Sequence, residues 1–156
     1  MKPFGLALYV HKLSKTGVGE YMIQAQDSGY RSWLTSIRIS GRLYLHEKAE
    51  VQRIEKEHPD FKNMPFSPDL IKIGVADDTG YGELELYQYL LEDIARIEKV
   101  FEAVENLCGT SARQILWHHF IELDTQEDLA SRLHISRRQL QYAMDKWMKK
   151  VYDDGQ

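Results

Sequence analysis

The strongest hydrophobic pattern in the chain lies between residues 83 and 108. Apolar side chains recur there at alternating spacings of three and four residues, which predicts one amphipathic helix with an apolar stripe on a single face. The stripe consists of Tyr87, Leu90, Ile94, Ile97, Phe101, Val104 and Cys108. Exposed apolar area of that size is unfavourable in water, so the stripe must be covered. Either the helix predicted over residues 30–58 covers it in an antiparallel hairpin, or a second copy of the same helix does.

A second helical pattern runs from Tyr30 to about Pro59, through which a helix cannot continue. Gly41 lies inside this pattern and marks a position for a kink or a break. Before it, residues 3–30 fit either a short helix or a strand, and the glycines of "KTGVGE" would allow a small β-hairpin at the N-terminus. The apolar face of the helix is predicted to contain Trp33, Ile37, Tyr44, Val51 and Ile54.

The segment between these two helices is predicted to be mostly loop. "PDFKNMPFSPD" holds three of the four prolines. "LIKIGVADDTGYGE" is a short apolar alternation followed by turn residues, so we expect an extended piece and then a loop. "DDTG" has no phosphate loop before it, so it is interpreted as a turn that precedes a helix and not as a nucleotide site.

The residues after Gly109, which is expected to end the long helix, predict three short helices. "TSARQILWHHFIE" is the first, Thr125 is a natural N-cap for the second, and Ser136 with Gln139 forms a capping box for the third, over residues 136–151. The intervening turn is only His134-Ile135-Ser136, and His134 must adopt the left-handed conformation that glycine usually takes there. Two helices joined so tightly are typical of a helix-turn-helix. Its inward positions are predicted to be Leu129, Ala130, Leu133, Ile135, Leu140, Ala143, Trp147 and Val151.

Positive charge is concentrated near the C-terminus of a chain whose net charge is −4. Residues 110–152 carry seven lysines and arginines against five aspartates and glutamates, whereas residues 1–109 carry thirteen against seventeen. A local basic face on an acidic chain is typical of a protein that touches a polyanion at one place. Cations also favour helix C-termini, which explains Lys149 but not Arg137 and Arg138 at a predicted helix start.

The first turns of the helix over residues 136–151 therefore fit the major groove of duplex DNA, which is wide enough to admit a helix. Arginine can bond guanine O6 and N7, and glutamine can bond adenine N6 and N7. The lysines further along suit phosphates, which contribute affinity but little sequence information. The candidate DNA-contacting residues are Ser136, Arg137, Arg138, Gln141, Tyr142, Lys146 and Lys149.

Residues 110–151, "TSARQILWHHFIELDTQEDLASRLHISRRQLQYAMDKWMKKV", resemble region 4 of bacterial sigma-70 factors, the module that reads promoter DNA. The match is carried by "TQEDLASRLHIS" and "MDKWMKKV", and the groove-facing positions of that family fall on Arg137, Arg138, Gln141 and Tyr142. No stretch resembles sigma region 2. The layout of residues 30–151 is also similar to small phage transcriptional regulators of the RinA and ArpU type.

The patterns and this resemblance together predict a mainly α fold. A helical hairpin would be followed by a C-terminal helix-turn-helix similar to sigma-70 region 4, with the small β-hairpin at the N-terminus as an option. Residues 1–108 would form an acidic N-terminal helical region that includes the long helix over residues 83–108. Residues 109–152 would form the DNA-binding domain.

The sequence carries no motif that indicates catalysis or metal binding. It contains no phosphate loop, Gly-x-Ser-x-Gly or histidine-glutamate zinc motif. The single cysteine, Cys108, excludes an internal disulfide, and the adjacent His118 and His119 point to different helix faces and so cannot share a metal as an i, i+4 pair. The apolar run near the start is too short for a membrane span. We expect a cytoplasmic, non-enzymatic protein without catalytic residues, metal or cofactor.

Two functions remain, and they belong to different classes. The first is a sequence-specific transcription regulator that binds double-stranded DNA, which the presence of Arg137, Arg138 and Gln141 favours. The second is a protein-interaction module, such as an anti-sigma or RNA polymerase-binding factor, whose helix-turn-helix no longer binds DNA. One helix-turn-helix offers few base contacts, so a DNA-binding role needs either a second copy or RNA polymerase to assist it. We favour a homodimer, which the apolar stripe over residues 87–108 could support by pairing across a two-fold axis.

Overall fold

The structure, a computed structural model, describes residues 18–64 and 81–156. These residues form helices and connecting turns and contain no strand, which confirms the prediction of a mainly α fold. The elements in chain order are α2 (Val18–Glu57), the short 3-10 helix η1 (Pro59–Asn63), α4 (Tyr81–Cys108), α5 (Thr110–Phe120), α6 (Gln126–Leu133) and α7 (Arg137–Asp154).

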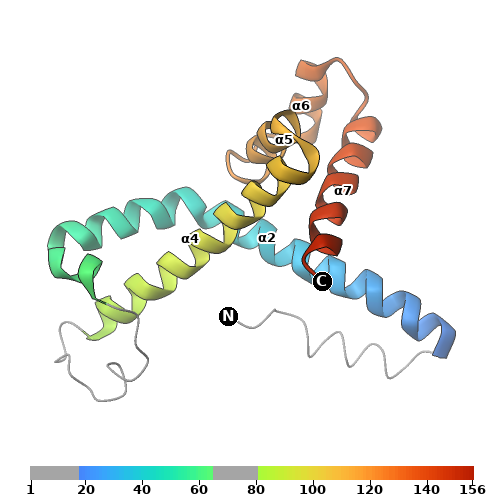
Figure 1. The fold of residues 1–156 in the computed structure, drawn as a ribbon. Helices are drawn as coiled ribbons and strands as arrows, with labels where there is room; N and C mark the ends of the chain where they lie inside the picture. Colours follow the sequence, from blue (N-terminus) through green and yellow to red (C-terminus); the bar gives the residue numbers. More distant parts are fainter. Residues whose placement is uncertain (1–17, 65–80) are drawn as a thin grey trace.

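The long helices α2 and α4 lie side by side and run in opposite directions (Figure 1). Arg53 of α2 contacts Glu83 near one end, at 3.5 Å between Nη2 and Oε2, whereas Arg96 of α4 donates a hydrogen bond to Ser36 further along, at 3.2 Å. The apolar stripe of α4 faces this contact, and its residues are buried except Cys108, which is half-buried. Of the two covers predicted for the stripe, the observed one is therefore the helix of the same chain, and the homodimer stays a prediction.

Two of the options that the sequence left open for α2 are not observed. The helix begins at Val18, so the residues of "GEYMIQAQ" that were expected to form part of a β-hairpin are helical. Glutamate, methionine, glutamine and alanine are good helix formers, which explains why this segment extends the helix. The rest of the proposed hairpin, residues 1–17, and the segment over residues 65–80 with "DDTG" lie outside the described residues.

The helix also continues through Gly41 without a break. A Cβ atom at this position would lie 2.8 Å from the backbone oxygen of Phe120. The glycine therefore has a packing role: its missing side chain lets the end of α5 approach the backbone of α2 closely.

The three C-terminal helices close the core at the end of α4 that is distant from η1 (Figure 1). Gly109 separates α4 from α5 at a φ of 99°, in the left-handed region, as its predicted role as a helix stop requires. The buried face of α7 consists of Leu140, Met144, Met148 and Val151.

Sequence reasoning misjudged part of this core. Ala143 and Trp147 are half-buried, because the buried face of α7 is centred on the two methionines. Leu133 and Ile135, both expected to point inward, are 40% and 37% exposed. They lie at the tip of the turn between α6 and α7, beyond the reach of the core below, which Leu129, Ala130 and Leu140 fill.

A buried polar cluster lies where α2 faces α4. Ser40 donates a hydrogen bond to Oδ1 of Asp93 at 2.9 Å, and Arg96 contacts the same oxygen at 3.2 Å. Glu47 is 4% exposed and adjoins Asp93. Burial, together with the hydrogen bond and the negative charge of Asp93, raises the pKa of Glu47 to about 8, so that this carboxyl group keeps its proton at neutral pH.

Candidate nucleic-acid interface

The ends of α6 and α7 are capped as their sequences predict. The backbone N–H of Asp128 donates to Oγ1 of Thr125 at 3.1 Å, at the start of α6. At the start of α7 the N–H of Gln139 donates to Oγ of Ser136 at 3.0 Å, and the N–H of Ser136 donates to Oε1 of Gln139 at 2.9 Å. These bonds satisfy backbone donors that have no partner inside a helix, so the position at which α7 begins is well determined.

The turn between α6 and α7 is short, and its first two N–H groups donate hydrogen bonds back to α6. His134 adopts φ 57° and ψ 40°, which confirms the left-handed conformation expected there. Its N–H donates to the oxygen of Ser131 at 3.2 Å, and the N–H of Ile135 donates to the oxygen of Ala130 at 3.1 Å. These bonds satisfy the last carbonyls of α6, as in other left-handed helix ends.

The first two turns of α7 present polar side chains to solvent. Arg138 and Gln141 are exposed, and Tyr142 is 72% exposed. Arg138 makes no ion pair with a carboxylate of residues 29–64 or 82–156. A guanidinium, an amide and a phenol thus share one exposed helix face, and each can donate hydrogen bonds to base edges or phosphates.

Arg137 and Ser136 differ from these three because their polar groups already have partners. Nη1 of Arg137 lies 3.1 Å from Oε1 of Glu127, and its Nε donates to Oε1 of Gln126 at 3.3 Å. The pair is exposed on both sides, so it is weak and can exchange for another partner. The hydroxyl of Ser136 serves the capping box described above.

The two lysines of the candidate set also differ from each other. Lys146 is exposed. Lys149 lies 2.9 Å from Oδ1 of Asp153, and its ammonium is 5.5 Å and 5.4 Å from the ring centres of Tyr30 and Tyr152. Its charge is thus directed toward neighbouring side chains of the protein, and its contact with phosphate stays a prediction.

The structure adds α2 to this surface, which sequence reasoning did not foresee. Tyr30 donates a hydrogen bond to Oδ1 of Asp145 at 2.8 Å, and burial together with that carboxylate raises the pKa of Tyr30. A cavity of about 440 Å³ lies between α2 and α7. It is lined from α2 by Tyr30, Leu34 and Arg38, from α7 by Arg138, Gln141, Tyr142, Met144, Asp145 and Met148, and otherwise by His119, Phe120 and Gln126.

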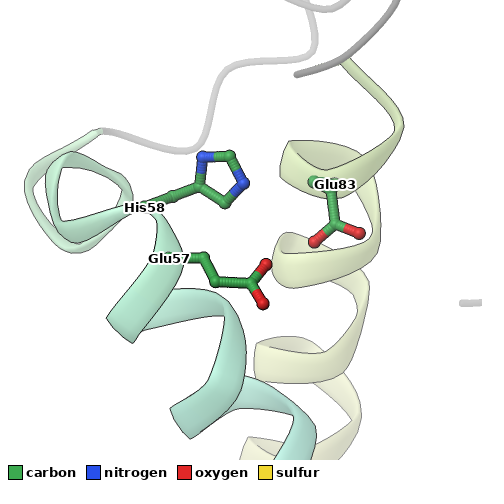
Figure 2. Close-up of side chains that lie close together, drawn as sticks. All are labelled: Glu57, His58 and Glu83. Atoms are coloured by element: carbon green, nitrogen blue, oxygen red, sulfur yellow. The ribbon is translucent and has the colours of Figure 1, made fainter.

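Among the described residues, two clusters of side chains have atoms close enough to share a metal ion, but an arginine already contacts carboxylates of each. Figure 2 shows the first, in which the side chains of Glu57, His58 and Glu83 point toward one another. The guanidinium of Arg53 contacts both of its carboxylates, at 2.9 Å and 3.5 Å, so that each already has a cationic partner.

The second cluster joins His118, Glu122 and Asp124. Nδ1 of His118 lies 2.6 Å from Oε2 of Glu122, and Arg132 donates a hydrogen bond to Oδ2 of Asp124 at 2.6 Å. His119, the neighbour of His118, points elsewhere and contacts the backbone oxygen of Asp124 at 3.2 Å. Burial lowers the pKa of His119, so its ring is uncharged at neutral pH.

Comparison with protein-family models, curated proteins and solved structures finds no match for this chain. Among the described residues, no helix combines the length and the apolar character that a membrane crossing requires.

Proposed function

We propose that this chain is a sequence-specific DNA-binding transcription regulator in which α6, the turn and α7 act as a helix-turn-helix. The first turns of α7 would enter the major groove. The observation that carries this proposal is the exposed row of Arg138, Gln141 and Tyr142 in the first turns of α7. The capping box of Ser136 determines where this helix begins. In a helix-turn-helix, the N-terminal residues of the second helix contact base edges.

The side-chain chemistry supports the same reading. Arg138 is exposed and can reach two acceptors of a guanine, whereas Gln141 can make two hydrogen bonds to an adenine. Each such pair contributes about 1–3 kcal/mol of discrimination against a wrong base. Arg137 would first have to exchange Glu127 for a base or a phosphate, so we assign it a smaller role than Arg138.

A few base contacts supply less than the roughly 4–10 kcal/mol that separates specific from non-specific binding. The stripe of α4 is covered by α2, so it does not supply a dimer contact. Assistance from RNA polymerase at a promoter, as in sigma factors, therefore fits this chain better than a dimer through α4. A second copy bound through another face would be revealed by the mass of the protein in solution at micromolar concentration.

The alternative is a protein-interaction module that uses the same helices without DNA. The engagement of Arg137 with Glu127 and of Asp145 with Tyr30 favours it, because both contacts reduce the polar groups that α7 offers to a partner. A module of that kind would contact protein, such as RNA polymerase or a sigma factor, and would have no preferred DNA sequence.

The test is a selection of duplexes from a random library with the full chain, followed by titration of the enriched site. We expect one sequence to be enriched. In the double variant Arg138→Ala, Gln141→Ala, the ratio of the affinity for that site to the affinity for an unrelated duplex should fall at least tenfold, since tenfold corresponds to about 1.4 kcal/mol. The matched control is Lys99→Ala, an exposed residue of α4, which should leave the preference unchanged.

Two results would contradict the proposal. The library could show no enrichment with the folded protein, which would favour the protein-interaction module. The double variant could also keep the full preference while its circular dichroism spectrum matches that of the wild type, and α7 would then not be the reading element.

A further inference from the structure

Two arginines on α2 make no ion pair with the carboxylates whose side chains the structure describes. Arg38 and Arg42 are one helical turn apart and exposed, and neither makes an ion pair with an acidic side chain of the described residues. No aspartate or glutamate stands three or four positions from either of them. Like charges at this spacing repel each other and destabilise a helix slightly. Arg53, on the same helix, instead contacts Glu50, Glu57 and Glu83.

Arg38 faces the candidate reading helix, and Arg42 lies next to Arg38 on the side of the turn between α5 and α6. Arg38 lines the same cavity of about 440 Å³ as Arg138, Gln141 and Tyr142. Arg38 and Arg42 together line an adjoining cavity of about 250 Å³ that extends toward Thr125, the cap of α6. Three arginines from two distant parts of the sequence thus line two cavities that share Arg38, His119 and Phe120.

Three arginines line these cavities against two aspartates, so the arginines are in excess. Asp145 accepts the hydrogen bond of Tyr30, and Asp124 accepts one from Arg132. The ring of His119, which lines both cavities, is uncharged at neutral pH because burial lowers its pKa. The net charge offered to a ligand is therefore positive and comes from the arginines.

The packing of α2 holds these charges at a defined distance from α7. At one end, Tyr30 bonds Asp145, and Gly29 passes so close to Tyr152 that a Cβ atom would lie 2.7 Å from its hydroxyl oxygen. At the other end, Gly41 lies against the backbone of Phe120. Arg38 stands between the two contacts, and its guanidinium lies over the ring of Phe120, 5.5 Å from the ring centre.

We propose that Arg38 and Arg42 bind the phosphodiester backbone of the duplex whose bases α7 reads. This inference rests on the proposed function. A helix in the major groove is flanked by phosphates, and basic side chains beside the helix contact them. Guanidinium groups suit this task, because they remain charged and bond phosphate oxygens in pairs. In this arrangement, α2 is part of the DNA-binding surface as well as a cover for α4.

The test is the salt dependence of binding for the enriched site and for an unrelated duplex. Each phosphate neutralised lowers the slope of log K against log salt by about 0.9. The double variant Arg38→Ala, Arg42→Ala should therefore have a slope shallower by about 1.8, and it should bind both duplexes more weakly by roughly the same factor. The charge-matched control Lys56→Ala, Lys99→Ala, at exposed positions away from α7, should keep the wild-type slope.

A second variant separates charge from packing, because Arg38 also covers the ring of Phe120. Arg38→Lys, Arg42→Lys keeps both charges and should restore most of the slope. The inference is overturned if the wild type binds its site and the alanine variant, folded by circular dichroism, has the same slope as the control. If the folded wild type binds no duplex at all, the proposed function fails and this inference fails with it.

Discussion

Replacing Gly41 by alanine tests the packing of α2 on the end of α5, on which the placement of Arg38 depends. The added Cβ would lie 2.8 Å from the oxygen of Phe120 and 3.4 Å from its carbonyl carbon. Both are backbone atoms, so no side-chain rotation relieves the contact and one helix has to move.

Two opposing contributions determine the size of the effect. Alanine favours the helix over glycine by about 1 kcal/mol in an exposed interior position. Overpacking of a tight contact costs about 1–3 kcal/mol. We therefore expect Gly41→Ala to lower the free energy of unfolding by about 1 kcal/mol, with a range from near zero to about 2 kcal/mol. For a chain of this size, 1 kcal/mol corresponds to a fall of about 2–4 °C in Tm.

The measurement is thermal unfolding followed by far-UV circular dichroism. The matched control is Gly82→Ala, because Gly82 is exposed in the first turn of α4 and a Cβ there would meet nothing within 4 Å. That variant should keep the wild-type Tm or raise it. If Gly41→Ala unfolded at a clearly higher temperature than the wild type, helix propensity would dominate and the close approach of α5 would not exist.

Two further predictions concern the α2–α4 pair. Phe101→Asp places a charge at a position that is 1% exposed, so it should lower the free energy of unfolding by several kcal/mol and abolish cooperative unfolding. The control Glu102→Ala, on the exposed face of α4, should unfold like the wild type. An unchanged Tm for the aspartate variant would show that Phe101 is not in the core. The second concerns Glu47, whose pKa is raised from its ordinary value of 4.5 to about 8, so the folded chain retains a proton that the unfolded chain releases. Its contribution to stability is fully present below about pH 4.5 and is lost as the pH rises through about 8. Urea titrations between these limits should show that Glu47→Gln loses less stability with rising pH than the wild type does, and parallel curves would mean that Glu47 does not titrate in this range.

The helical positions and their caps could be predicted from local sequence. The a/d stripe of α4 predicted both a helix and its buried face, because the spacing of apolar residues alone determines which side of a helix can be buried. Gly109, Thr125 and Ser136 marked helix ends, since capping depends on a residue and its neighbours within one turn. The exposed row of Arg138, Gln141 and Tyr142 followed from the same register.

Local sequence failed where a residue's role depends on a distant partner. Gly41 was expected to weaken a helix, yet its role depends on the backbone of Phe120, which is far away in sequence. The burial of Met144 and Met148 in place of Ala143 and Trp147 depends on how α7 is rotated against α2 and α4.

The clearest example is the surface that α2 shares with α7. Arg38 and Arg138 are a hundred positions apart, and neither sequence neighbourhood indicates that they border one cavity. Their proximity follows from the hydrogen bond of Tyr30 to Asp145 and from the glycine contacts of α2, which only the assembled fold creates. The sequence alone determined where α4, α5, α6 and α7 form and which face of α4 is buried, because both depend on short-range spacing. The tertiary structure alone decided which charges lie together, because electrostatic neighbours are determined by distance in space and not along the chain.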